Sequence, residues 1–233
     1  MTYPESYFTA RASWRDWRIE ANLLIDLARV SQGTRVLEIG CGGGGLLRLL
    51  RERGACAVGV DTLEVALQLA RENKGERGRL GDWENVTHSP THPLSRSLVR
   101  IGEDSTLPFR DGAFDAMVGQ HVVEHLPDAD AALREWKRLL KPGGRLALAT
   151  PNANYPDPAH FADADHAHVF SPRELSDAAV RAGFVVEACS TIFPFLTRAR
   201  ALRGLGVIGY RAFQRAPYFA ARGRTILLGA RKD

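Results

Sequence analysis

The chain has 233 residues, of which 45% are hydrophobic and 25% are charged, and it carries a formal net charge of +4. This size and balance suit one large α/β core, and no apolar run approaches the roughly 18 residues of a membrane-spanning helix. The odd number of cysteines, Cys41, Cys56 and Cys189, argues against the disulfide framework of a secreted protein. Because the N-terminus has neither a basic start nor an apolar core, we expect a cytoplasmic protein.

The first predicted element is a helix over residues 12–30. Its stripe consists of six apolar side chains: Trp14, Trp17, Ala21, Leu24, Ile25 and Ala28. A stripe at this spacing is typical of a helix that packs against a core. In an alternative interpretation, the preceding Tyr7-Phe8 segment folds over a bound ligand, and residues 1–32 then serve as an N-terminal helical lid.

A short apolar strand, Val36–Ile39, leads directly into a glycine-rich turn before a predicted helix, Leu46–Glu52. Glycines in such a turn let the backbone bend tightly and come close to a ligand. The next predicted strand, Ala57–Asp61, ends on a carboxylate 21 positions after Gly40. At that spacing an acid can accept hydrogen bonds from both hydroxyls of a ribose. The two features together predict a binding site for a nucleoside cofactor.

The charge of Glu38 indicates which nucleoside binds. The sequence Gly40-Cys41-Gly42-Gly43-Gly44-Gly45 also fits the dinucleotide pattern G-x-G-x-x-G, but Glu38 at the strand end would repel a pyrophosphate. At ~5 Å and an effective dielectric near 20, each like-charge pair costs on the order of 3 kcal/mol before screening. The same carboxylate attracts an ammonium group. S-adenosylmethionine carries one, and its own carboxylate can face the start of the following helix.

The rest of the chain alternates between apolar strands and segments of helical periodicity. Predicted strands cover residues 97–101, 114–119, 146–150, 184–190 and 225–230. Predicted helices cover residues 62–73, the segment with Leu133, Trp136, Leu139 and Leu140 that ends at Lys141-Pro142-Gly143-Gly144, and a segment from Ser171 to Gly183. Residues 74–96 read as a long loop or a short insertion. Because ligands of open α/β sheets lie outside the carboxyl ends of the strands, we expect Gln120, His121 and Glu124 near the cofactor or its partner substrate.

Five ordered motifs within residues 33–190 resemble those of class I S-adenosylmethionine-dependent methyltransferases. They are Glu38-x-Gly40-x-Gly42-x-Gly44, Asp61, and the segments 102–115, 121–128 and 140–146. The resemblance implies a doubly wound, Rossmann-like α/β fold: a mainly parallel seven-stranded sheet with helices on both faces, in which the last two strands form an antiparallel edge. It also implies that the Glu103 side chain meets the adenine amino group and that the backbone amide of Asp104 meets the ring. In an alternative interpretation Asp104 caps a helix. The implied cofactor-binding set is Glu38, Gly40, Gly42, Gly44, Asp61, Glu103, Asp104 and Gln120.

Residues 157–168 contain three histidines and three aspartates. A methyl acceptor must lose a proton during the attack on a sulfonium methyl group, and a histidine can take that proton near neutral pH. The candidate catalytic residues are His121, His166 and His168. His160, His166 and His168 have two other interpretations: they cap loop backbone before the helix at Ser171, or they chelate a metal. No metal site is predicted, because the aspartates have no fixed register.

The C-terminal part is strongly basic. Residues 198–233 contain nine basic side chains and one acid, so this segment carries +8 and the remainder carries −4. It contains no aromatic-interleaved RNA motif and no helix-turn-helix, so nucleic acid is not favoured as a partner. The insertion at 191–224 alternates apolar pieces with arginines. It has four interpretations: ordinary packing with a solvated basic face, a cover for a substrate pocket, a subunit contact, or peripheral contact with an anionic membrane.

The sequence as a whole is interpreted as a single methyltransferase-like domain over residues 1–233. We expect an S-adenosylmethionine-dependent methyltransferase acting on a small-molecule or lipid- or sugar-linked acceptor, with oxygen favoured over nitrogen or carbon as the attacking atom. The alternatives are an NAD-dependent oxidoreductase and a catalytically silent cofactor-binding protein. Fold and cofactor motifs do not exclude the silent protein, because function resides in the site and not in the fold. The oligomeric state is left open.

Overall fold

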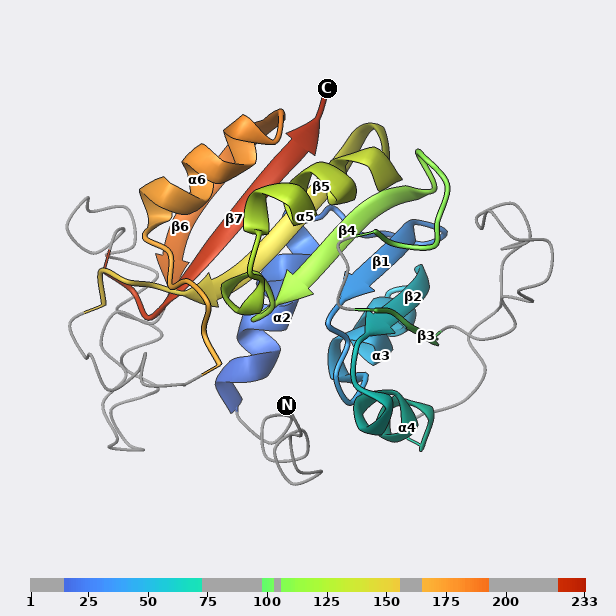
Figure 1. Cartoon of the computed structure of the whole chain (residues 1–233). Helices are drawn as coiled ribbons and strands as arrows, with labels where there is room; N and C mark the ends of the chain where they lie inside the picture. Colours follow the sequence, from blue (N-terminus) through green and yellow to red (C-terminus); the bar gives the residue numbers. More distant parts are fainter. Residues whose placement is uncertain (1–14, 73–97, 103–105, 156–164, 193–221) are drawn as a thin grey trace.

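The computed structural model describes residues 15–72, 98–102, 106–155, 165–192 and 222–233 (Figure 1). Several predictions fall outside these ranges: the Tyr7-Phe8 lid, the 74–96 loop, the Glu103 and Asp104 contacts to adenine, His160, and most of the 191–224 insertion. Helix α2 (Arg15–Leu27) is the only described element of the predicted lid region. Within the described part of its predicted stripe, Ala21, Leu24 and Ile25 are buried and Trp17 is half-buried. Among the described residues, no helix is long and apolar enough to cross a membrane.

Seven strands form one sheet in the order β3-β2-β1-β4-β5-β7-β6. Their bounds are β1 (Arg35–Ile39), β2 (Cys56–Asp61), β3 (Leu98–Arg100), β4 (Phe114–Gln120), β5 (Leu140–Pro151), β6 (Phe184–Ile192) and β7 (Thr225–Lys232). The first five strands pair in parallel, and β7 pairs antiparallel with both β5 and β6. The predicted seven-stranded, mainly parallel sheet with an antiparallel edge is confirmed.

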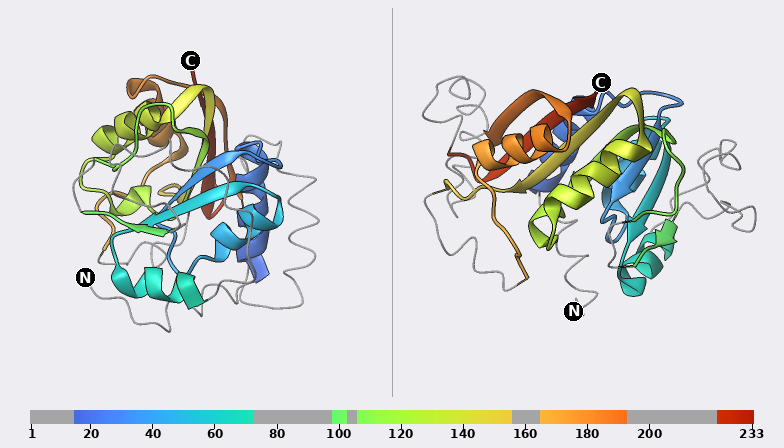
Figure 2. Two further views of the ribbon diagram at one scale, coloured as in Figure 1. Left: turned by 90° about the vertical axis from the view of Figure 1, so that its right-hand side faces the viewer. Right: turned by 45° about the horizontal axis from the view of Figure 1, so that its top comes forward.

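Helices cover both faces of this sheet, as predicted. Besides α2, the described residues form α3 (Gly45–Glu52), α4 (Glu64–Glu72), the 3-10 helix η1 (Val123–His125), α5 (Ala129–Leu139) and α6 (Pro172–Arg181). Figures 1 and 2 show α5 and α6 on one face, and α2 and α3 on the other. Side chains alternate accordingly along β1: Val36 joins the core cluster with α2 and α3, whereas Leu37 joins the cluster with α5 and α6. Each face therefore buries its own apolar layer.

The boundary between α5 and β5 differs from the prediction. Leu140 was expected on the buried face of the helix, with Lys141-Pro142-Gly143-Gly144 as a turn before the strand. In the structure Leu140 is buried but opens β5, where it pairs with Phe114. The pairing then shifts, so that Ala116 pairs with Arg145, and Gly143 adopts a φ of 74° within this irregularity. Pairing with β4 therefore begins the strand earlier, and the extra residues form a bulge.

The chain order of the strands places a switch point between β1 and β4. From β1 the chain proceeds to β2 and β3 on one side, and returns to β4 and β5 on the other. In open α/β sheets a ligand binds at such a point, outside the carboxyl ends of the strands. The residues at the ends of β1, β2 and β4 are therefore the first candidates for a functional site.

Candidate active site

The glycine-rich turn after β1 is shaped by close contacts from other parts of the protein. Gly40, Gly42 and Gly44 have positive φ angles of 64°, 49° and 76°. A Cβ on Gly40 would lie 2.1 Å from Cγ2 of Val122, in the turn after β4, and a Cβ on Gly45 would lie 2.9 Å from the Trp17 ring on α2. The glycines therefore permit a tight turn and also allow α2 and the β4 exit to close onto it.

Glu38 is a buried carboxylate with unused hydrogen-bonding capacity. It lies on the central strand β1, opposite Gly59 and Val118 on the neighbouring strands, and is 3% exposed. Its Oε2 atom accepts no hydrogen bond from the described residues. Burial, then the charge of Asp61, raises the pKa of Glu38 well above its usual value, although Arg51 and the Leu47 amide oppose the shift. A cationic group would supply the missing partner.

Asp61, at the end of β2, is held by backbone amides. Its Oδ2 accepts from the amide of Gly42 at 2.9 Å, and its Oδ1 accepts from the amide of Leu63 at 2.9 Å. Burial raises the pKa of Asp61, and these amides oppose the shift. Each carboxylate oxygen keeps a second acceptor site, so the group can still receive hydroxyl protons. Asp61, the residue predicted to bind the ribose, is thus hydrogen-bonded directly to the glycine turn.

The end of β4 is linked to α2 by side chains. Nε1 of Trp17 donates to Oε1 of Gln120 at 3.0 Å, and Nε2 of Gln120 donates to Oε1 of Glu20 at 2.7 Å. Nε2 of His121 lies 3.0 Å from the same Glu20 oxygen. Both ends of the Gln120 amide are therefore engaged by α2. Sequence reasoning missed Glu20, although its place beside Ala21 and three residues after Trp17, on the apolar stripe, was a signal for a buried acid.

Glu124 lies next to the His121 ring and is fully buried. Oγ1 of Thr150 donates to its Oε2 at 2.9 Å. Its Oε1 is 3.3 Å from Nδ1 of His121, within ion-pair range, yet it accepts no hydrogen bond of good geometry from the described residues. Burial acts to raise the pKa of Glu124, but the adjacent His121 outweighs it and the pKa is lowered. His121 itself adopts a φ of 57°, which is uncommon for a residue with a side chain.

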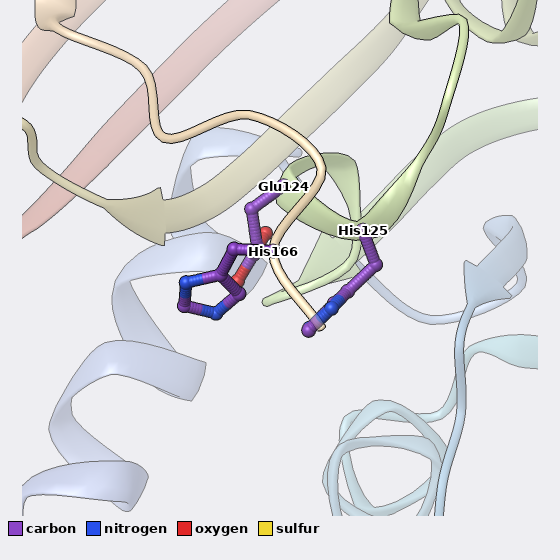
Figure 3. Close-up of side chains that lie close together, drawn as sticks. All are labelled: Glu124, His125 and His166. Carbon is purple, nitrogen blue, oxygen red and sulfur yellow. The ribbon is translucent and has the colours of Figure 1, made fainter. Parts of the chain in front are cut away.

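The backbone of Glu124 also brings the segment after β5 to this place. Its carbonyl oxygen accepts from the amides of Ala167 at 2.8 Å and His168 at 3.0 Å. The His166 ring then lies beside the His125 ring, with the ring centroids 5.0 Å apart (Figure 3). The His168 side chain is exposed and packs edge-on against Phe170 at 4.4 Å.

Of the three predicted catalytic histidines, His121 and His166 flank Glu124. His168 contributes its backbone amide to Glu124 and directs its ring to Phe170. The catalytic roles of these residues stay predictions, as do the cofactor contacts of the whole predicted set from Glu38 to Gln120. The geometry does establish two adjoining groups of acids at the carboxyl ends of the central strands. Glu38 and Asp61 belong to β1 and β2, whereas Glu20 and Glu124 surround His121 at the end of β4.

Comparisons with known proteins agree on one type of domain. Residues 11–188 match the model of a family described as a methyltransferase domain. A ubiquinone biosynthesis O-methyltransferase of Pseudomonas aeruginosa (strain LESB58) is 35% identical over 122 residues, which are 52% of this chain and 46% of that protein. A protein of the same name from Bordetella avium is 29% identical over 196 residues, 77% of this chain and 73% of the relative. The chain thus spans about half the length of the first of these relatives.

Solved structures show the same fold at low sequence identity. An S-adenosylmethionine-dependent methyltransferase from Mesorhizobium loti superposes with a TM-score of 0.65 at 18% identity, covering 95% of this chain and 100% of that chain. Phosphoethanolamine N-methyltransferase 2 of Haemonchus contortus, in complex with S-adenosyl-L-methionine, superposes with a TM-score of 0.62 at 17% identity. That match covers 93% of this chain and 52% of that chain.

Proposed function

The chain belongs to the family of methyltransferase domains, and on this premise we propose that it transfers the methyl group of S-adenosylmethionine to an oxygen of a small-molecule acceptor. The observation that supports S-adenosylmethionine as the cofactor is the buried Oε2 of Glu38, which accepts no hydrogen bond from the described residues. The cofactor's ammonium group matches this acceptor in charge and in hydrogen-bonding capacity. A pyrophosphate at the same place would face the buried acids Glu38 and Asp61.

When bound, S-adenosylmethionine supplies an electrophilic methyl group: an acceptor oxygen forms a bond to the methyl carbon while the carbon–sulfur bond breaks and leaves its electron pair on sulfur. Glu38 holds the amino end of the cofactor, and Asp61 holds the ribose hydroxyls in the orientation fixed by Gly42 and Leu63. The network at the end of β4 faces the acceptor. There His121, held by Glu20 and Glu124, takes the acceptor proton.

The names of the two curated relatives support oxygen as the methylated atom, in agreement with the sequence-based expectation. The proposed acceptor can also be a hydroxyl group on a lipid- or sugar-linked compound. We place the protein in the cytoplasm, because all three of its cysteines are free thiols. Peripheral membrane contact through residues 191–224 remains part of the proposal for a lipid-linked acceptor, and nucleic acid does not.

The first experiment is calorimetric binding of S-adenosylhomocysteine, with NAD as the comparator on the same sample. We expect micromolar binding of the first ligand, roughly −8 kcal/mol, and no binding of NAD. Glu38→Gln keeps the size of the side chain but removes its charge. It is expected to weaken S-adenosylhomocysteine by roughly 10- to 100-fold, because a hydrogen bond to a charged group contributes about 1.5–3 kcal/mol.

Glu52→Gln is the matched control, because Glu52 is an exposed acid on α3 whose partner is Arg48. It should leave both affinities unchanged. Binding of NAD alone would refute the proposal in favour of an oxidoreductase. If S-adenosylhomocysteine binds, release of the same compound from S-adenosylmethionine in the presence of a panel of hydroxyl acceptors measures transfer, and no turnover with any acceptor would indicate a silent binding protein.

A further inference from the structure

Glu124, His125 and His166 converge beside the proposed acceptor site. One candidate ligand atom from each residue lies within 4.8 Å of the corresponding atoms of the other two. Figure 3 shows the three side chains lying close together, with Glu124 and His125 on η1 and His166 on the segment after β5. Two polar atoms of these residues are buried and have no hydrogen bond to the described residues: Oε1 of Glu124 and Nδ1 of His166. Such groups are rare in folded proteins unless a ligand or ion completes them.

The third residue is oriented as a metal ligand usually is. Nδ1 of His125 lies 3.0 Å from the carbonyl oxygen of Asp165. Because a carbonyl can only accept, this nitrogen carries the proton, and Nε2 keeps its lone pair. Histidines that bind metals commonly donate their other ring N–H to a carbonyl or carboxylate, which fixes the tautomer and the ring orientation. Asp165 therefore acts as the outer partner of this histidine.

The two segments that supply the ligands are joined by hydrogen bonds. The Glu124 carbonyl accepts the amides of Ala167 and His168, and the Asp165 carbonyl accepts from His125. Thr150 holds the other carboxylate oxygen of Glu124 from β5. The three side chains thus meet in a place defined by several hydrogen bonds, and the convergence does not depend on one exposed side chain.

We propose that Glu124, His125 and His166 bind one divalent transition-metal ion, of the kind represented by Zn²⁺ and Co²⁺. Two imidazoles and one carboxylate are the donor set that such ions favour over Mg²⁺ or Ca²⁺, which prefer oxygen ligands throughout. Three protein ligands leave at least one coordination position open, as in metal sites that bind a substrate oxygen. Nδ1 of His121 lies beside Oε1 of Glu124, and this oxygen has lone pairs enough for both His121 and a metal ion.

The role of this ion rests on the proposed function. An acceptor hydroxyl at the open position loses its proton to His121 more readily, because the cation stabilises the resulting oxygen anion. That oxygen forms the bond to the methyl carbon, and the electron pair of the broken carbon–sulfur bond stays on sulfur. The ion also positions the acceptor, and positioning is a large part of catalysis in a displacement of this kind. Metal binding itself requires only the three ligands.

The test is titration of the chelator-treated protein with Co²⁺, followed by visible absorption, and with Zn²⁺, followed by calorimetry. We expect one equivalent of metal to bind, and we expect bound Co²⁺ to give the intense visible absorption of an ion with a low coordination number. His166→Gln should weaken binding by on the order of 100-fold, because it removes one of the three converging ligands. His125→Gln and Glu124→Gln should each do the same.

His168→Gln is the matched control, since this exposed histidine is two residues from His166 and its ring packs on Phe170. It should keep one equivalent and an unchanged spectrum. Each variant is first checked for folding by circular dichroism and for its affinity for S-adenosylhomocysteine. The absence of saturable metal binding, or equal binding by the wild type and all the variants, would overturn the inference. If the protein binds S-adenosylhomocysteine but no metal, the metal site is refuted and the proposed function stands. If it binds metal but no S-adenosylhomocysteine, the proposed function is refuted and the metal site stands.

Discussion

The two halves of the candidate site are built in different ways. In the first, the Glu38–Asp61 half, the acids are close in sequence, and the hydrogen bonds that hold them come from backbone amides at Gly42, Leu47 and Leu63. In the second, the His121–Glu124 half, the partners are side chains from α2, β4, η1 and β5. A site held by local backbone can be recognised from a short motif. A site held by distant side chains has no such signature, and it can differ between proteins with one fold.

The largest expected effect is on the contact that joins the two halves. Gly40→Ala places a Cβ 2.1 Å from Cγ2 of Val122 at a φ of 64°, so both steric overlap and backbone strain oppose folding. We expect a loss of about 3 kcal/mol in the free energy of unfolding, measured by urea denaturation. Gly143→Ala is the matched control, because it has a φ of 74° but nothing within 4 Å of the added Cβ, and it should cost only about 1 kcal/mol.

Val122→Ala in the Gly40→Ala background separates the two causes. It should recover the steric part of the loss and leave the part due to strain. If the double variant is no more stable than Gly40→Ala, the two halves are not coupled through this contact.

The two buried glutamates should respond to pH with opposite signs. The pKa of Glu38 is raised on folding, so its favourable contribution to stability is present below about pH 4.5 and is lost as the pH rises through the folded value. The pKa of Glu124 is lowered, so its contribution is present above about pH 4.5 and is lost as the pH falls through the folded value.

At pH 7, without ligand, Glu38→Gln should therefore stabilise the fold, whereas Glu124→Gln should destabilise it by roughly 1–3 kcal/mol through its partners His121 and Thr150. Unfolding free energies of the two variants across pH 4–8 measure both effects. Shifts of the same sign in the two variants would contradict the contrast between the halves.

Glu20→Gln tests whether the second half serves the reaction or only the fold. Glu20 acts through its contacts with Gln120 and His121, so it is a positioning residue. We expect a roughly 10-fold loss of kcat in the methyl-transfer assay, with a change in the pH profile and little change in affinity for S-adenosylhomocysteine. Asp26→Asn on the same helix is the control, because Asp26 is exposed and pairs with Arg53. An unchanged pH profile in Glu20→Gln would limit Glu20 to a structural role.

Much of the fold was predictable because its signals are local. The strand before the glycine turn and the start of α6 at the Ser171–Glu174 capping box follow from short patterns, and both are confirmed. The boundary at Leu140 was not predictable in the same way. A leucine fits a helix face or a strand, and pairing with Phe114 on β4 decides the outcome.

The amino-acid sequence by itself determined the positions of the strands, the glycine turn and the pair Glu38 and Asp61, because periodicity and short spacings are local signals. Resemblance to a known family implied how the strands are arranged in one sheet. Only the tertiary structure decided that Glu20 would contact His121, and that His166 would lie beside His125 and Glu124. These pairs are 101, 41 and 42 positions apart in the chain. Their contacts depend on how α2 and the segment after β5 pack at the end of β4, and no local pattern encodes that packing.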